Sequence, residues 1–175
     1  MKNKTKTLRG ALIGVAVISA FTFSSIGYGE EPVREYYANG QLKSEKNFKD
    51  GKLEGTLKTY YENGRLKMEM VYKDGKLAGA FKKYDENGKL DSVESFQDGQ
   101  PDGLFQEYYQ NGQVKSETVF KDGEPNGLYQ EFSENGQLKD ETVFKNGQSD
   151  GVFYENDKKG NLEAVKKPWP KNLRG

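Results

Sequence analysis

The sequence repeats itself every 24 residues along most of its length. An Asn-Gly pair, an Asp-Gly pair and a lone glycine recur at this period without insertion. The Asn-Gly pairs begin at Asn39, Asn63, Asn87, Asn111 and Asn135, and the Asp-Gly pairs at Asp50, Asp74, Asp98 and Asp122, with Asn146 in the fifth copy. A fixed period between 20 and 50 residues indicates an array of small units that stack on one another.

The segment from each Asn-Gly pair to the next Asp-Gly pair has the pattern of a strand. Leu66, Met68, Met70 and Tyr72 alternate with polar residues or Val71, which is a period of two. The two ends of the same apolar face in the sister segments are Leu42/Phe48, Leu90/Phe96, Val114/Phe120 and Leu138/Phe144. These segments are predicted to be strands with one apolar face.

The segment from each lone glycine to the next Asn-Gly pair is less regular. Its bulky residues stand three apart, as in Leu57 and Tyr60 or Phe105 and Tyr108, which suits a helix better than a flat strand. The segments are only about six residues long and lie between glycines, and their paired aromatic residues favour strand. We therefore expect strands in which a bulge or a strong twist accommodates the spacing.

Two kinds of turn are expected to join these strands. Asn-Gly between two strand signals predicts a two-residue type I′ hairpin turn, with positive φ at both residues. The stretch 50–55 and its equivalents should form a longer loop, because Pro101 and Pro125 stand between two glycines there. The expected turn residues are Asn39, Gly40, Gly51, Gly55, Asn63, Gly64, Gly75, Gly79, Asn87, Gly88, Gly99, Gly103, Asn111, Gly112, Gly123, Gly127, Asn135, Gly136, Gly147 and Gly151.

These elements predict an all-β fold. Five units of two strands give an elongated, single antiparallel sheet of about ten strands, a meander of β-hairpins roughly 50 Å long. The repeat array is expected to span residues 30–167, and the pattern weakens toward its end. Residues 168–175 begin with Pro168-Trp169-Pro170 and are interpreted as a C-terminal cap or tail, since proline cannot extend the ladder and Trp169 offers apolar cover.

The first 29 residues have the composition of a secretory signal peptide. Lys2, Lys4, Lys6 and Arg9 precede an apolar run over 11–23, and small residues end the segment at Gly29. The alternative is a retained membrane anchor, although an apolar core of 13 residues is short for a span of about 20. The sequence predicts export to the periplasm, the cell envelope or the medium, with no transmembrane span in the mature chain.

Composition excludes several kinds of chemistry. The chain has no cysteine and no histidine, so disulfides, thiolate nucleophiles, Cys/His zinc sites and histidine-based triads are impossible. The two ends hold eight bases and no acid, which leaves 19 bases against 27 acids in residues 30–163, a net charge of −8. An acidic body repels phosphate, so nucleic acid is not an expected partner.

The run Phe48-Lys49-Asp50-Gly51-Lys52-Leu53-Glu54-Gly55, followed by Tyr60-Tyr61-Glu62-Asn63-Gly64, resembles the MORN repeat. It is most similar to the bacterial MORN-variant repeat of proteins labelled YwqK-family antitoxins, over about residues 34–163. The resemblance implies antiparallel hairpins in an extended open sheet and a role as a scaffold for protein contact, with lipid binding claimed for some members. It supplies no catalytic motif, and the export signal departs from an antitoxin that works in the cytoplasm.

Two aromatic columns follow the repeat. The column Phe48, Tyr72, Phe96, Phe120 and Phe144 is interpreted as packing within the sheet. The column Tyr60, Tyr84, Tyr108 and Phe132 is the candidate partner-binding surface, for a peptide or for sugar rings. Lys43, Lys67, Lys115 and Lys139 and the glutamates two residues later are expected to form a solvated, weakly paired face, which Asp91 and Val93 interrupt in the third unit.

No residue set predicts catalysis, a cofactor or a metal site. Every carboxylate belongs to a repeat column, a turn or the tail, and neither 85–88 nor 156–163 has the ligand spacing of a calcium loop. The first hypothesis is therefore an exported, non-enzymatic repeat protein that presents a sheet surface to a protein partner. The alternatives are an antitoxin-like protein that neutralises a partner toxin, on the resemblance alone, and a carbohydrate-binding surface that uses the tyrosine column.

Overall fold

A computed structural model describes residues 31–149, 153–156 and 162–165 of the chain. All regular elements in this part are strands. They are β1 (Val33–Tyr36), β2 (Leu42–Lys46), β3 (Phe48–Lys49), β4 (Lys52–Leu53), β5 (Gly55–Tyr60), β6 (Leu66–Lys73), β7 (Lys76–Tyr84), β8 (Leu90–Gln97), β9 (Gln100–Tyr108), β10 (Val114–Lys121), β11 (Glu124–Pro125), β12 (Gly127–Phe132), β13 (Leu138–Lys145), β14 (Gln148–Ser149), β15 (Phe153–Asn156) and β16 (Leu162–Val165).

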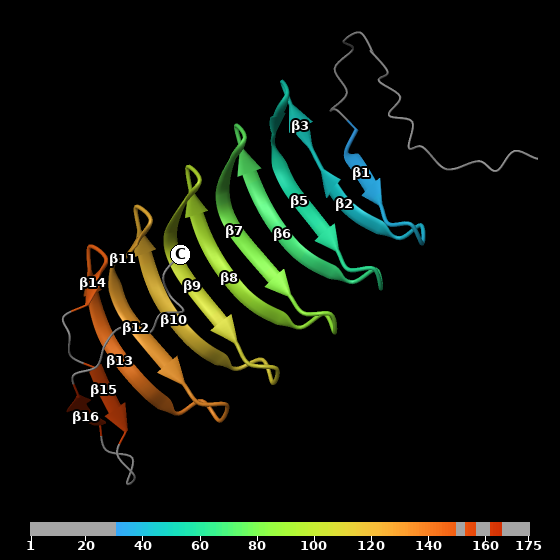
Figure 1. The fold of residues 1–175 in the computed structure, drawn as a ribbon. Coiled ribbons are helices and arrows are strands. Elements are labelled where there is room, and N and C mark those ends of the chain that lie inside the picture. The colour runs from blue at the N-terminus through green and yellow to red at the C-terminus, as the bar shows by residue number, and fades with distance from the viewer. Residues whose placement is uncertain (1–30, 150–152, 157–161, 166–175) are drawn as a thin grey trace, which may run out of the picture.

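The strands form one long antiparallel sheet in chain order. The path runs β1-β2-β5-β6-β7-β8-β9-β10-β12-β13-β15-β16, while β11 and β14 pair with β10 and β13 and the short β3 and β4 pair with each other. Figure 1 shows a single curved layer whose colours advance from one end to the other, with hairpin connections along both long edges. The expectation of an all-β, open meander of hairpins is confirmed. The signal-like segment 1–29 and the tail 168–175 lie outside the described residues.

The Asp-Gly pairs form the two-residue hairpin turns, not longer loops. Asp74 and Gly75 have φ of 51° and 82°, and Lys73 pairs directly with Lys76 on the other side of the turn. Positive φ at both central residues is the requirement of a type I′ turn. The loop expected over 50–55 and its equivalents is therefore wrong, because β7 and β9 begin immediately after the turn.

Proline does not interrupt this part of the ladder. Pro101 lies in β9 opposite Phe96, and its carbonyl accepts a 2.9 Å hydrogen bond from Gly123 N in the next hairpin. The N and the carbonyl of a strand residue point to the same side. The missing N–H of Pro101 therefore costs no bond to β8, and proline is tolerated at a paired position.

The Asn-Gly pairs lie in three-residue loops, so the predicted type I′ turn is wrong there. Gly64 N donates to Tyr61 O at 2.9 Å, and Tyr61 N donates to Arg65 O at 2.8 Å. Only the glycine has positive φ, 82° at Gly64, whereas Asn63 does not. This is a turn followed by one left-handed residue, the usual three-residue hairpin loop. Asn63 instead uses its side chain, whose Oδ1 accepts from Arg65 N at 3.0 Å.

A bulge follows each of these loops and divides the apolar pattern between two faces. Tyr60 pairs with Leu66, but Thr59 pairs with Met68, so Lys67 is the extra residue. Because side chains alternate along a strand and paired residues share a face, Leu66 lies on the face opposite to Met68 and Met70. The single apolar face predicted for 66–72 is corrected accordingly. The equivalent shift recurs in β1–β2, β7–β8, β9–β10 and β12–β13.

We call the two sides of the sheet face A and face B. Face A carries Met70, Phe96, Phe120 and Phe144 with their paired neighbours, and face B carries Tyr60, Tyr84, Tyr108 and Phe132. The two aromatic columns therefore lie on opposite sides of the sheet. The bulky residues three apart in the sequence are divided in the same way, with Phe105 on face A and Tyr108 on face B.

Buried side chains gather on face A. Ser116, Thr118, Tyr129, Thr142 and Phe144 are each at most 3% exposed, and all belong to its rows. Aromatic rings also meet there, at 6.3 Å between the centroids of Phe81 and Phe96 and 6.1 Å between Phe105 and Phe120. The interpretation of the phenylalanine column as packing agrees with this arrangement, in which face A is the better covered side.

Of the lone glycines, Gly79 and Gly103 lie inside β7 and β9, whereas Gly55 and Gly127 begin β5 and β12. Gly151 lies outside the described residues. Gly79, Gly103 and Gly127 have φ of 120°, 110° and 142°, and they sit where the register with the neighbouring hairpin shifts. A Cβ at Gly103 would lie 2.9 Å from Ser95 Cβ. These positions need glycine both for the backbone conformation and for the close approach of the next strand. They are bulge residues and not turn residues as expected.

Candidate binding surface

Face B presents three parallel rows of side chains that run across the strands. Each row is formed by residues that pair across neighbouring strands, and each strand contributes one residue to a row. The first row lies beside the Asn-Gly loops, the second follows the middle of the sheet, and the third lies toward the Asp-Gly turns. Face B is the more open side, since none of the buried residues of the described chain lies on it.

The first row contains the tyrosines predicted as a binding surface. Tyr60, Tyr84, Tyr108 and Phe132 pair with Leu66, Leu90, Val114 and Leu138 respectively. All four aromatic side chains are half-buried. Tyr108 Oη donates a 2.9 Å hydrogen bond to Gln106 Oε1, which ties the first row to the second. The structure therefore brings the predicted residues together in one line on the open face.

The middle row changes chemistry along the array. Over β1–β7 it alternates bases and acids, with Arg34 Nε 3.1 Å from Glu45 Oε2 and Glu69 placed 3.6 Å from both Lys58 Nζ and Lys82 Nζ. Val93 in β8 then interrupts it.

Over β9–β13 the same positions are neutral or acidic. Gln106 Nε2 donates to Glu117 Oε2 at 2.8 Å, and Gln130 Nε2 donates to Glu141 Oε2 at 2.7 Å. No base faces either of these two carboxylates within the described sheet.

The third row changes at the same place. Its members over β5–β8 are Thr56, Val71, Ala80 and Ser95, none of which is an exposed large apolar residue. Its members over β9–β13 are Leu104, Val119, Leu128 and Val143, with exposed fractions of 43%, 40%, 41% and 46%. The end of face B over β9–β13 therefore combines an exposed apolar row with acids that form no ion pair within the described sheet. We call this part of face B the β9–β13 surface.

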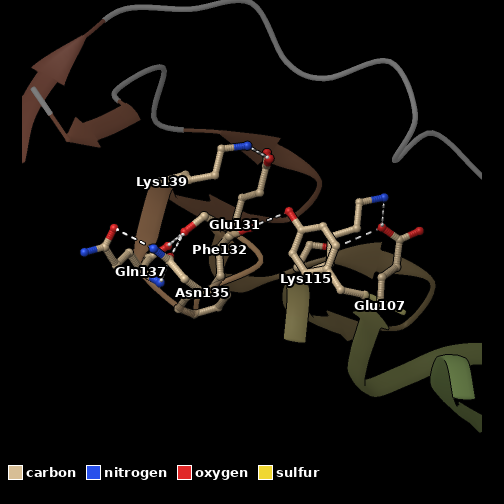
Figure 2. A network of polar contacts seen from close by, with 10 residues as sticks. Glu107, Lys115, Glu131, Phe132, Asn135, Gln137 and Lys139 are labelled. Carbon is tan, nitrogen blue, oxygen red and sulfur yellow. Dashed lines mark hydrogen bonds and ion pairs between the residues drawn. The ribbon is translucent and has the colours of Figure 1, made fainter. Parts of the chain in front are cut away.

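Face A carries ion pairs beside the Asn-Gly loops instead. Lys115 Nζ lies 3.5 Å from Glu107 Oε2, and Lys139 Nζ lies 2.5 Å from Glu131 Oε1, because the bulge turns each lysine to the same side as its partner. Figure 2 shows both pairs and the neighbouring loop residues Asn135 and Gln137. In the first unit the glutamate at the equivalent position, Glu35, pairs with Lys46 at 2.7 Å instead, and Lys43 Nζ lies 5.8 Å from the centre of the Tyr37 ring.

One carboxylate on face A is placed in apolar surroundings. Glu94 in β8 pairs with Phe81 on one side and with Phe105 on the other. Burial raises the pKa of Glu94 above its ordinary value of 4.5; Lys83 lowers it, and repulsion from Glu107 adds to the increase. Glu94 is therefore flanked by two packing rings of face A, with Lys83 and Glu107 close enough to act on its charge.

The described residues contain neither a cluster of metal-binding side chains nor a helix that could span a membrane. No group of three or more Asp or Glu side chains in 31–149, 153–156 and 162–165 is arranged to bind a metal ion. Among the same residues, no helix has the length and apolarity needed to cross a bilayer.

The repeats of the sheet match a known protein family. The model described as "MORN repeat variant" matches residues 32–50, 53–74, 77–98, 101–122 and 125–146. These segments make up more than half of the chain. The chain belongs to the MORN repeat variant family. Each matched segment of this MORN repeat protein contains one Asn-Gly loop and ends at an Asp-Gly or Asn-Gly turn, so the family boundaries follow the hairpins of the sheet.

Solved structures and curated proteins add little to the family assignment. Two crystal structures of TarM, one of them an S. aureus mutant bound to Fondaparinux, alpha-GlcNAc-glycerol and UDP, match with TM-scores of 0.38 and 0.37 and identities of 10% and 12%. The match covers 69% and 67% of the MORN repeat chain but only 21% and 22% of TarM. No curated protein sequence matches. No functional argument follows from likeness at this level.

The sequence did not indicate the residues that join one repeat to the next. Tyr37, Tyr61 and Tyr109 each donate a hydroxyl hydrogen bond to the carbonyl of the residue 23 positions later, at 2.7 to 2.8 Å. Asn39, Asn63 and Asn111 do the same with their side-chain amides, at 2.7 to 3.2 Å. The signal was present in the Tyr-Tyr pairs, whose second member recurs at the repeat period.

Proposed function

We propose that this MORN repeat protein is an exported, non-enzymatic scaffold whose face B binds a protein partner. The observation that carries the proposal is the open face B, on which an aromatic row lies beside a polar middle row and, over β9–β13, an exposed apolar row lies on the other side of that middle row. Exposed apolar side chains gathered on one face, with polar side chains beside them, are typical of protein interaction sites. The signal-like composition of residues 1–29 supports a site of action outside the cytoplasm.

Cross-linking from defined positions tests the binding function. A photoreactive amino acid at Tyr84 would probe face B, and the same amino acid at Leu57 would probe face A as a matched control. Protein adducts from the Tyr84 position and none from the Leu57 position are expected in cells that express the full chain. Absence of adducts from every face B position would contradict the proposal.

The location is tested separately, by intact mass of the protein in each cell fraction. A mature chain that begins near Glu30, recovered from the envelope, periplasm or medium, is expected. A full-length chain in the cytosol would remove export from the proposal and would favour the antitoxin-like alternative, for which a partner toxin should then co-purify.

Carbohydrate binding is a second candidate, supported by the row of Tyr60, Tyr84 and Tyr108 on the open face. The tyrosine rings recur every second strand, about 10 Å apart, so an extended sugar chain laid across the strands would meet more than one ring. A glycan array should show binding that disappears when all three tyrosines are replaced by alanine. Binding that persists in the triple variant, or no binding by the wild type, would dismiss this candidate.

A further inference from the structure

Two rows of face B change chemistry together between β8 and β9. The fold itself does not require the change, because equivalent strands form with either set of residues. The strands β5 and β7 carry Thr56, Lys58, Ala80 and Lys82, and the strands β9 and β12 carry Leu104, Gln106, Leu128 and Gln130 at the same repeat positions. The apolar residues over β9–β13 are also exposed, so they do not contribute to a core. The residues of two separate rows thus differ from the residues at the same repeat positions in the earlier units, without a structural need. This part of face B is therefore a candidate binding site.

We infer that the β9–β13 surface binds an amphipathic helix that carries Lys or Arg beside an apolar stripe. This inference rests on the proposed protein-binding function and adds the class of partner. Charge gives the first argument. Glu117 and Glu141 each accept a hydrogen bond from a neutral glutamine. A partner that supplies Lys or Arg would therefore form ion pairs with both carboxylates.

Backbone chemistry gives the second argument. The N–H and C=O groups of β9–β13 pair with neighbouring strands, so face B has no backbone partners to offer an extended peptide. An extended segment laid on this face would leave its own backbone groups without partners. A helix satisfies its backbone internally and needs only side-chain contacts, which is what the surface provides.

Spacing gives the third argument. Equivalent residues such as Glu117 and Glu141 are two strands apart, which is about 9.6 Å across a sheet. Seven residues of a helix rise about 10.5 Å, so bases at positions i and i+7 would reach both acids. The apolar row lies two residues further along each strand, about 7 Å away, within the width of one helix. A second copy of this chain fits less well, because Lys58 and Lys82 already face Glu69.

Three synthetic 18-residue helical peptides test the inference against the purified full chain. They share one leucine stripe and differ only at positions i and i+7, which are both Lys, both Gln or both Glu. Fluorescence anisotropy should give the order Lys, Gln, Glu in decreasing affinity, with at least about a tenfold difference between the first and last. The affinity of the Lys peptide should fall as salt is raised. No binding of the Lys peptide, or equal affinity for all three, would overturn the inference.

Variants that exchange one end of the array for the other locate the site. Leu104→Thr, Gln106→Lys, Leu128→Ala and Gln130→Lys together give the β9–β13 surface the residues of the earlier units, which the fold already accommodates. The Lys peptide should bind this variant at least about tenfold more weakly, with an unchanged circular dichroism spectrum. The reverse exchange, Thr56→Leu, Lys58→Gln, Ala80→Leu and Lys82→Gln, should not weaken binding. The assignment would be refuted if the Lys peptide bound normally to the variant changed at 104, 106, 128 and 130 but weakly to the variant changed at 56, 58, 80 and 82.

The cross-linking experiment separates the two proposals. If no face B position yields a protein adduct, the proposed protein-binding function fails, and binding of the synthetic peptide would not reflect a partner in the cell. If adducts form from Tyr84 but not from a photoreactive residue at Leu128, the protein-binding function stands and the β9–β13 surface is the wrong site.

Discussion

The Tyr61 hydroxyl donates a 2.7 Å hydrogen bond to the backbone carbonyl of Tyr84, 23 residues further along the chain. Burial, and then the negative charge of Glu86, raise the pKa of Tyr61, which keeps the hydroxyl protonated as a donor. The bond joins two successive Asn-Gly loops, as the equivalent bonds of Tyr37 and Tyr109 do. The second tyrosine of each pair is thus a connector between repeats, whereas the first lies on face B.

Tyr61→Phe should therefore lower the free energy of unfolding by about 0.5–1.5 kcal/mol, the usual contribution of one such bond. Tyr84→Phe is the matched control, since the Tyr84 hydroxyl forms no hydrogen bond within the described sheet and its loss should change stability by less than about 0.5 kcal/mol. Urea titration of both variants measures the difference. Equal effects would mean that the Tyr61 bond contributes nothing beyond ring packing.

Gly103→Ala should destabilise the protein more than Gly112→Ala. Both glycines have positive φ, 110° and 84°, so both variants lose about 1–2 kcal/mol to backbone strain. The new Cβ at Gly103 would also meet Ser95 Cβ at 2.9 Å, whereas nothing lies within 4 Å of a Cβ at Gly112. Thermal unfolding compares the two. A lower Tm for Gly112→Ala would show that the close approach at Gly103 is relieved at little cost.

Glu94→Gln should stabilise the protein at neutral pH. The raised pKa of Glu94 means that the folded protein holds this proton more tightly than the unfolded chain does. Ionisation of Glu94 therefore lowers the free energy of unfolding as the pH rises from about the ordinary value of 4.5 through the folded pKa. Glutamine avoids the ionisation. The Tm of the variant should exceed that of the wild type at pH 7, and the gain should shrink near pH 4. A gain that is the same at both pH values would assign the effect to packing.

Glu69→Gln should have little effect on stability, although two lysines face this carboxylate. Lys58 Nζ and Lys82 Nζ both lie 3.6 Å away, and their side chains are 43% and 40% exposed. Solvent screens such pairs, which contribute at most about 1 kcal/mol. Unfolding free energies measured at low and at high salt provide the check. A loss well above this limit would indicate that the middle row is a coupled network.

The sequence alone was sufficient for the architecture. The 24-residue period, the glycine pairs and the alternating strands led to an open sheet of hairpins because each signal acts locally, within one or two hairpins. The same locality explains what was missed. A period of two assigns Leu66 and Met68 to one face, but a single bulged residue, Lys67, moves them to opposite faces. Nothing in the composition of 66–72 distinguishes a regular strand from a bulged one.

The predicted turn types are also reversed: the Asp-Gly pairs form the type I′ turns, and the Asn-Gly pairs lie in three-residue loops. Asn-Gly is the stronger type I′ signal by composition, yet the Asn63 side chain caps its loop and the connection takes three residues. Asp74 adopts the left-handed conformation instead, at φ 51°. The candidate binding row of Tyr60, Tyr84 and Tyr108 was found because its members share a repeat position. The β9–β13 surface was not found, because it is defined by residues that differ between repeats.

The connector bonds have one gap in the middle of the array. Asp85 replaces the tyrosine of the third loop, and its Oδ1 accepts bonds from Asn87 N and Lys89 N within its own loop. Within the described sheet, no tyrosine or asparagine connector joins the third and fourth loops. They are linked instead by Lys89 Nζ to Gln110 O and by a hydrogen bond between the Gln110 and Asp85 side chains. A chain pulled from its two ends in an optical trap should part first at this seam, into two blocks of hairpins. The seam also lies beside the strands where face B changes chemistry, so the two blocks differ both in what they present and in how firmly they are joined.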